Sequence, residues 1–165
     1  MSRLVDSPPD WSRSWASFGE ISARAGLQTG ELLHLQDSSH CGLTICYSLP
    51  LSWQRAANIG SQAGLDAIGV GLVLEGGITA SVGESQLACG ANDGFVFDLS
   101  KDIKFVDDFL TTTKICILWL PRIRLRLASL HLTRGVKFTG ATLAGAVLAA
   151  TLRTLADRSV ETEAS

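Results

Sequence analysis

Residues 69–99 read GVGLVLEGGITASVGESQLACGANDGFVFDL, and this stretch decides the fold. Short apolar or alternating runs are separated at close intervals by Glu75-Gly76-Gly77, Gly83-Glu84 and Asn92-Asp93-Gly94, which are typical turn sequences. The spacing predicts a β-meander of short strands. Strands this close together bury their apolar faces only by curling into a barrel or by packing on a second sheet.

More strands are predicted on both sides of this stretch. Residues 111–120 read TTTKICILWL, a continuous β-branched and apolar run that is typical of a central strand buried on both faces. In residues 41–49, Leu43, Ile45 and Tyr47 fall on one side of an alternating run. Together with shorter runs at 31–36, 51–55 and 103–107, these patterns predict a β-barrel over residues 30–120.

Helices are predicted after the barrel. Pro121 suits a first helical position, and Ile123, Leu127 and Leu130 then form an apolar face. Arg122, Arg124 and Arg126 lie off that face, and we interpret them as solvated rather than as a phosphate-binding patch. A second helix is predicted over residues 139–158. One of its faces carries Leu148, Leu152 and Leu155, and another carries Ala141, Gly145 and Ala149, so two faces can be buried.

Residues 1–18 are predicted to be a lead-in followed by a short helix. Pro8-Pro9 disfavours regular structure, and Trp11, Trp15 and Phe18 then recur at helical spacing. This aromatic stripe is expected to dock on the barrel, with a ligand-gating lid as the alternative.

Composition excludes several classes of protein. The 165 residues fit one domain, and a net charge of −2 with a pI near 5.9 offers no basic surface for nucleic acid. The 139–158 segment is too short and too rich in Ala and Thr for a membrane span. Four dispersed cysteines and an N-terminus without an apolar leader predict a cytoplasmic protein with reduced thiols. An apolar content of 46% indicates either an Ala-rich helix or a surface covered by a partner.

No catalytic or metal-binding motif is present. The sequence has no phosphate-binding loop, dinucleotide-binding motif, HExxH or GxSxG. The three histidines, His34, His40 and His131, are not closely spaced as a metal-binding pair. Asp107 and Asp108 point to opposite faces if they lie on a strand, so they cannot share a substrate atom. We therefore expect no catalytic residue, no metal, no cofactor and no enzymatic activity.

The order of several short motifs resembles the N-terminal sensory domain of AraC/XylS-type transcription regulators. The motifs are LVLEG at 72–76, Asn92-Asp93, the strand from Phe95 to Asp98, and LPR at 120–122, and the similarity extends from about Trp11 to about Leu155. The resemblance implies a cupin-like barrel of the jelly-roll type followed by two helices. It also implies an effector-sensing function and a dimer contact through the C-terminal helices. Members of this family read DNA through helix-turn-helix units, which we do not find in residues 1–165.

The leading hypothesis is therefore an effector-sensing and dimerisation domain that forms a homodimer in the cytoplasm and contacts no membrane. A small barrel can hold one small-molecule effector, and Tyr47, Trp53 and Trp119 combine an apolar body with one hydrogen-bonding group. Core filling is the alternative for these three. The expected dimer interface comprises Ala141, Gly145, Leu148, Ala149 and Leu152. The alternatives for function are a metal-independent cupin-like enzyme and an interaction domain with a filled barrel that pairs with full-length regulators.

Overall fold

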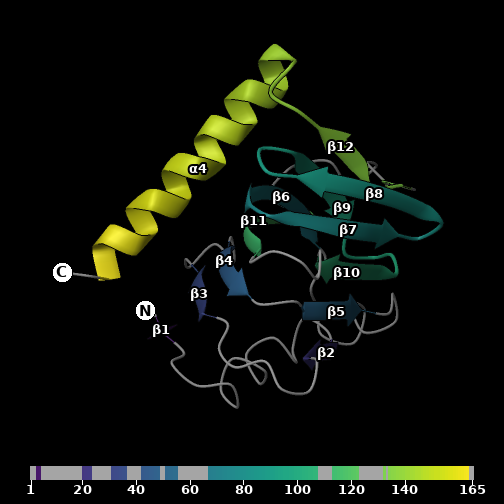
Figure 1. The fold of residues 1–165 in the computed structure, drawn as a ribbon, viewed down its shortest axis with the longest axis horizontal. Helices are drawn as coiled ribbons and strands as arrows, with labels where there is room; N and C mark the ends of the chain where they lie inside the picture. The colour runs from purple at the N-terminus through teal and green to yellow at the C-terminus, as the bar shows by residue number, and fades with distance from the viewer. Residues whose placement is uncertain are drawn as a thin grey trace.

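The structure is a computed structural model, and its labels follow Figure 1. It describes residues 3–4, 20–23, 31–36, 42–48, 51–55, 67–107, 113–122, 132 and 134–163. The strands are β1 (Arg3–Leu4), β2 (Glu20–Ala23), β3 (Glu31–Gln36), β4 (Gly42–Ser48), β5 (Leu51–Arg55), β6 (Ala67–Glu75), β7 (Gly77–Val82), β8 (Ser85–Gly90), β9 (Gly94–Asp98), β10 (Ile103–Asp107), β11 (Thr113–Pro121) and β12 (Val136–Phe138). The helix α4 (Leu143–Glu163) follows them.

The strands form two antiparallel sheets. A seven-stranded sheet has the order β1-β3-β4-β11-β6-β9-β12, and a five-stranded sheet has the order β2-β5-β10-β7-β8. From β4 to β11 the chain crosses between the sheets so that first and last strands pair, β4 with β11 and β5 with β10. This interleaving is the jelly-roll arrangement of cupins. The predicted cupin-like, mainly β fold is therefore confirmed.

The turns of the 69–99 stretch form where the sequence predicts them, but the strands do not form a meander. Gly76 and Gly83 adopt φ values of 73° and 55°, and Asn92 adopts 70°, a conformation that Gly and Asn tolerate best. The turn at Gly76 carries the chain from one sheet to the other, and within this stretch only β7 and β8 are sequence neighbours that pair. The meander prediction was wrong because β6 is buried on both faces and needs the centre of a sheet.

Strand β11 is central, as its composition predicts, and lies between β4 and β6. Its residues Ile115, Ile117 and Trp119 face the interior between the sheets. The intervening Cys116 is fully buried on the opposite face, where it packs with residues of α4. The seven-stranded sheet therefore has two apolar faces, one toward the barrel interior and one toward α4 (Figure 1).

The helical predictions are only partly confirmed. Helix α4 begins at Leu143, four residues after the predicted start at 139, because Thr142 caps it by accepting a hydrogen bond from the Gly145 N–H at 3.1 Å. Where the sequence predicts two C-terminal helices, α4 is the one whose bounds fall within the described residues. Pro121 ends β11 opposite Ala67, and Arg122 directly after it is already helical. Residues 123–131 and the aromatic stripe from Trp11 to Phe18 lie outside the described residues.

Three short strands were missed. Arg3–Leu4 pairs with β3 rather than forming a loose lead-in, and Glu20–Ala23 and Val136–Phe138 pair with β5 and β9. Each is too short to show a periodic pattern, so only its partner strand defines it. No helix in the described part of the chain is long and apolar enough to cross a membrane.

Candidate functional site

The interior of the described barrel is packed with aromatic side chains. Phe95 and Phe97 are fully buried, and the Phe97 ring lies 5.3 Å from Phe105 and 5.7 Å from Trp119, measured between centroids. The two near-perpendicular contacts at Phe97 are the geometry that aromatic quadrupoles favour. Trp119, a predicted effector residue, is therefore part of this packed core and only 4% exposed.

Two glycines make this packing possible. Gly71 lies opposite Phe95, and Gly69 lies opposite Phe97, on the neighbouring strands β6 and β9. A Cβ atom at either glycine would collide with the phenylalanine ring that crosses it. The bare backbone of β6 thus provides the space into which the two rings fold.

The other two predicted effector residues are placed by strand register alone. Position 47 follows Leu43 and Ile45 in the alternation of β4, and those two side chains pack on the α4 side of the sheet, away from the interior. Position 53 is paired with Phe105 in the other sheet. Of the histidines, His34 lies on β3 opposite Thr44, and His40 and His131 lie outside the described residues. Among residues that are described, no group of three His, Cys, Asp or Glu is placed to hold a metal ion.

Helix α4 rests on the outer face of the seven-stranded sheet through a narrow row. Leu152 and Ala156 are 1% and 2% exposed, Gly145 is buried, and Ala149 is half-buried. The Cys116 thiol reaches the Leu152 carbonyl with an Sγ–O distance of 3.8 Å, and burial raises the pKa of this thiol to about 12. Gly145 and Ala149, which the sequence predicts as part of a dimer contact, therefore face the barrel of their own chain.

The backbone packing at the start of α4 leaves room only for a glycine at position 145. A Cβ atom at this position would collide with the Thr139 carbonyl oxygen. Ala141 precedes the helix, in the turn in which its N–H donates to Thr139 Oγ1. Neither position therefore offers a helical contact surface for a second chain.

The exposed side of α4 carries a run of large apolar side chains. Leu143 is 84% exposed, Val147 56%, Leu148 40% and Leu155 36%. At about 100° of rotation per residue, Leu143 and Val147 lie on the side away from Leu152 and Ala156, whereas Leu148 and Leu155 flank that buried row. We call this set the outer ridge. Of the predicted dimer residues, Leu148 belongs to it. The predicted face of Leu148, Leu152 and Leu155 exists, with Leu152 buried against the sheet and the other two partly exposed at its border.

A polar turn at residues 92–93 contacts both elements that follow β11. Lys137 of β12 donates to the Asp93 carboxylate at 2.7 Å and to the Ala88 carbonyl at 2.8 Å. Arg153 of α4 donates to the Asn92 side-chain oxygen. Burial tends to raise the pKa of Asp93, but the hydrogen bonds from Lys137 and the Gly90 N–H outweigh it and lower that pKa. The hydrogen bond with Asp93 in turn raises the pKa of Lys137.

A buried ion pair joins the ends of β9 and β11. Asp98 is fully buried and Arg122 is 6% exposed, with 2.6 Å between Asp98 Oδ2 and Arg122 Nη2. Burial tends to raise the pKa of Asp98, but the hydrogen bond from the Ser100 N–H and the Arg122 guanidinium lower it overall. The prediction of a solvated Arg122 was wrong, because its partner lies on a strand that is distant in sequence.

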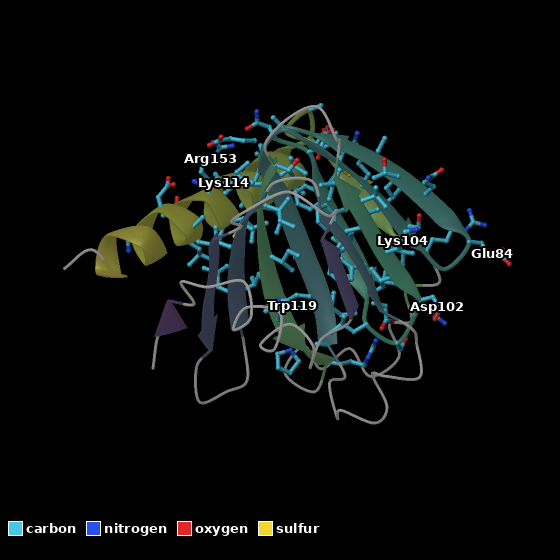
Figure 2. All side chains as sticks on the ribbon, turned by 60° about the horizontal axis from the view of Figure 1, so that its bottom comes forward. Glu84, Asp102, Lys104, Lys114, Trp119 and Arg153 are labelled. Atoms are coloured by element: carbon cyan, nitrogen blue, oxygen red, sulfur yellow. The ribbon has the colours of Figure 1, made fainter. Side chains whose placement is uncertain are left out.

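Figure 2 places the labelled residues on this framework. Lys114 and Trp119 lie toward opposite ends of β11, and Arg153 lies on the same side as Lys114. The sequence predicts a turn at Asn92-Asp93 and a strand that ends at Asp98, but it indicates no partner for these side chains. Lys137 and Arg153 carried no local signal, because neither belongs to a recognisable motif.

Comparison with known proteins yields structural likeness only. No protein-family model matches the sequence, and no curated protein matches it either. The AraC-like transcriptional activator CuxR superposes with a TM-score of 0.62 at 16% identity, covering 74% of this chain and 47% of CuxR. The chain thus spans about half the length of CuxR. A glyoxylate-induced protein of Pseudomonas aeruginosa superposes with a TM-score of 0.52 at 11% identity, covering 73% of this chain and 45% of that protein. At these identities the likeness establishes a cupin-like fold.

Proposed function

We propose that this chain is the sensory and dimerisation domain of an AraC-type transcription regulator, and that it has no enzymatic activity. The observation that carries the proposal is the outer ridge: Leu143 and Val147 stand exposed on the side of the helix away from the barrel, and Leu148 and Leu155 extend this apolar surface to the edge of the seated face. Apolar surface that the chain's own fold leaves uncovered marks an interaction site. The likeness of the fold to an AraC-like activator supports the regulatory class.

In this proposal, α4 pairs with α4 of a second copy. Leu152 and Ala156 hold one side of the helix against β6 and β11, which leaves Leu143 and Val147 facing away from the barrel. A twofold pairing buries the same ridge from both partners. An effector or partner that binds one arrangement of the pair better than another would then bias the placement of attached DNA-reading domains.

The oligomeric state tests this proposal. We expect light scattering to give the mass of a dimer at micromolar concentrations, and Val147→Glu to raise the dissociation constant by about 100-fold, because it buries an unpaired carboxylate in an apolar seam. Ala146→Glu is the matched control. It introduces the same side chain one residue earlier, at an exposed position off the ridge. A monomeric wild-type chain, or equal effects of both variants, would contradict pairing through the ridge.

A second candidate function is an interaction domain that pairs in the same way but binds no effector. Phe95, Phe97, Phe105 and Trp119 fill the described interior, which favours an interaction domain with a filled barrel. Ligand screening by thermal unfolding separates the two, because a ligand that binds only the folded state raises the unfolding temperature with its concentration. A saturable shift supports the sensory domain, and none across a broad set of small molecules supports the filled barrel.

A further inference from the structure

We propose that the turn at Asn92 and Asp93 is a latch that holds α4 on the barrel and thereby sets how readily the chain pairs. The inference rests on the proposed pairing through α4 and adds its regulation. The latch consists of Asn92, Asp93, Lys137 and Arg153. Its importance follows from how firmly the turn is fixed to the barrel, and from how little else holds the helix.

The barrel side of the latch is rigid. The Asn92 N–H donates to the Val73 carbonyl at 2.8 Å, and the Val73 N–H donates to the Asp93 carbonyl at 2.9 Å. Asp93 also accepts from the Gly90 N–H through its side chain, at 2.9 Å. Val73 is fully buried in the interior core, so a change in the packing of that core reaches the turn through two backbone hydrogen bonds.

The other side of the latch contacts β12 and α4, the two described elements that follow β11. Lys137 ties β12 to Asp93 and to the edge of β8 at Ala88, and Arg153 ties α4 to Asn92. The Phe138 ring lies over the bare backbone of Gly94, the residue immediately after the turn. One short turn therefore contacts two successive elements of the C-terminal segment.

The apolar seat of α4 is small. Within the part of the helix whose side chains are described, Leu152 is the one large apolar residue that is buried, and Gly145, Ala149 and Ala156 contribute little surface. Apolar stabilisation scales with buried area. The hydrogen bond from Arg153, the residue after Leu152, therefore adds a polar tie to this turn of the helix.

Loosening the latch has a predictable consequence for pairing. If α4 detaches from the barrel more often, the ridge is ordered for a smaller fraction of the time. The free-energy cost of ordering it then weakens the association of two copies. The latch therefore couples the packing of the barrel interior to the affinity of the pair.

Substitutions of Asn92 test the latch without disturbing the turn, because glycine and aspartate both tolerate its positive φ of 70°. We expect Asn92→Gly to speed hydrogen exchange of the α4 amides by about 3- to 10-fold relative to those of β6, and to weaken pairing by a similar factor. Asn92→Asp converts the hydrogen bond from Arg153 into an ion pair and is expected to slow exchange. Ala91→Gly is the control for adding a glycine to the same turn, and Arg153→Ala should reproduce Asn92→Gly.

The outcomes separate the latch from the pairing proposal. Exchange is measured on dilute protein, so it reports on α4 even if the wild-type chain never dimerises. Unchanged α4 exchange in both Asn92→Gly and Arg153→Ala would overturn the latch and leave pairing standing. Altered exchange with identical dissociation constants in all variants would overturn its control of pairing.

Discussion

Arg122→Met is expected to lower the free energy of unfolding by about 3–5 kcal/mol, because it leaves the Asp98 carboxylate buried without its counter-charge. Asp98 is fully buried and Arg122 nearly so, with 2.6 Å between their charged atoms. Ser100 remains as a partner of Asp98 through its N–H and its side chain, but neutral donors do not replace a guanidinium. Urea unfolding of the variant and the wild type measures the difference.

A double variant distinguishes loss of the pair from loss of packing. Asp98→Asn retains an acceptor for the Ser100 N–H and removes the charge. In the Arg122→Met background it is therefore expected to recover at least half of the lost stability, since no unpaired charge stays buried. If the double variant is as unstable as the sum of the single variants, the two residues do not act as a pair.

The same ion pair predicts a pH dependence. The folded pKa of Asp98 lies below its usual value, so folding favours the charged form. The stability that this provides is complete above the unfolded pKa of about 3.9 and is lost as the pH falls through the lower folded pKa. The stability advantage of the wild type over Asp98→Asn should thus be constant near neutral pH and shrink below about pH 4. Urea titrations at several pH values measure it, and an advantage that persists in acid would contradict this assignment.

Gly71→Ala is expected to destabilise the fold by about 2–3 kcal/mol, although alanine normally improves on glycine within a strand. The added Cβ would collide with the Phe95 ring, which is fully buried between the sheets and has nowhere to move. Gly90→Ala is the matched control, because a Cβ there meets only Asp93 Oδ2 at 3.9 Å. We expect that variant to stay within about 0.5 kcal/mol of the wild type.

A mutant cycle identifies the ring as the cause. Phe95→Leu alone costs buried area, but in the Gly71→Ala background it also relieves the collision. We therefore expect the double variant to be more stable than the sum of the single effects predicts, measured by urea unfolding. Additive effects would show that Gly71 is needed for another reason, such as backbone geometry.

Local pattern was sufficient where a segment's own residues determine its structure. The turns at Gly76, Gly83 and Asn92 formed as predicted, because residues that accept positive φ stand between β-forming runs. The β-branched run ending at Leu120 became a central strand, since its composition fits burial on both faces. Jelly-roll topology was anticipated from family resemblance, whereas periodicity alone suggested a meander.

Tertiary structure decided everything that depends on a distant partner. Arg122 is buried because Asp98 lies beside it in the fold, and nothing near Arg122 in the sequence announces an acid. Leu43 and Ile45 fall on the helix side of their sheet because the register with β11 sets the face of each residue in β4, and register follows from pairing.

Helix α4 shows the same division. The sequence by itself determined that residues 143–158 form a helix with more than one apolar face. Only the fold decided that Gly145, Leu152 and Ala156 meet the sheet while Val147 and Leu148 stay exposed. The physical reason is that a helix with apolar residues on several sides has no intrinsic inner face, so the sheet selects the side with the smallest residues, which allow the closest approach.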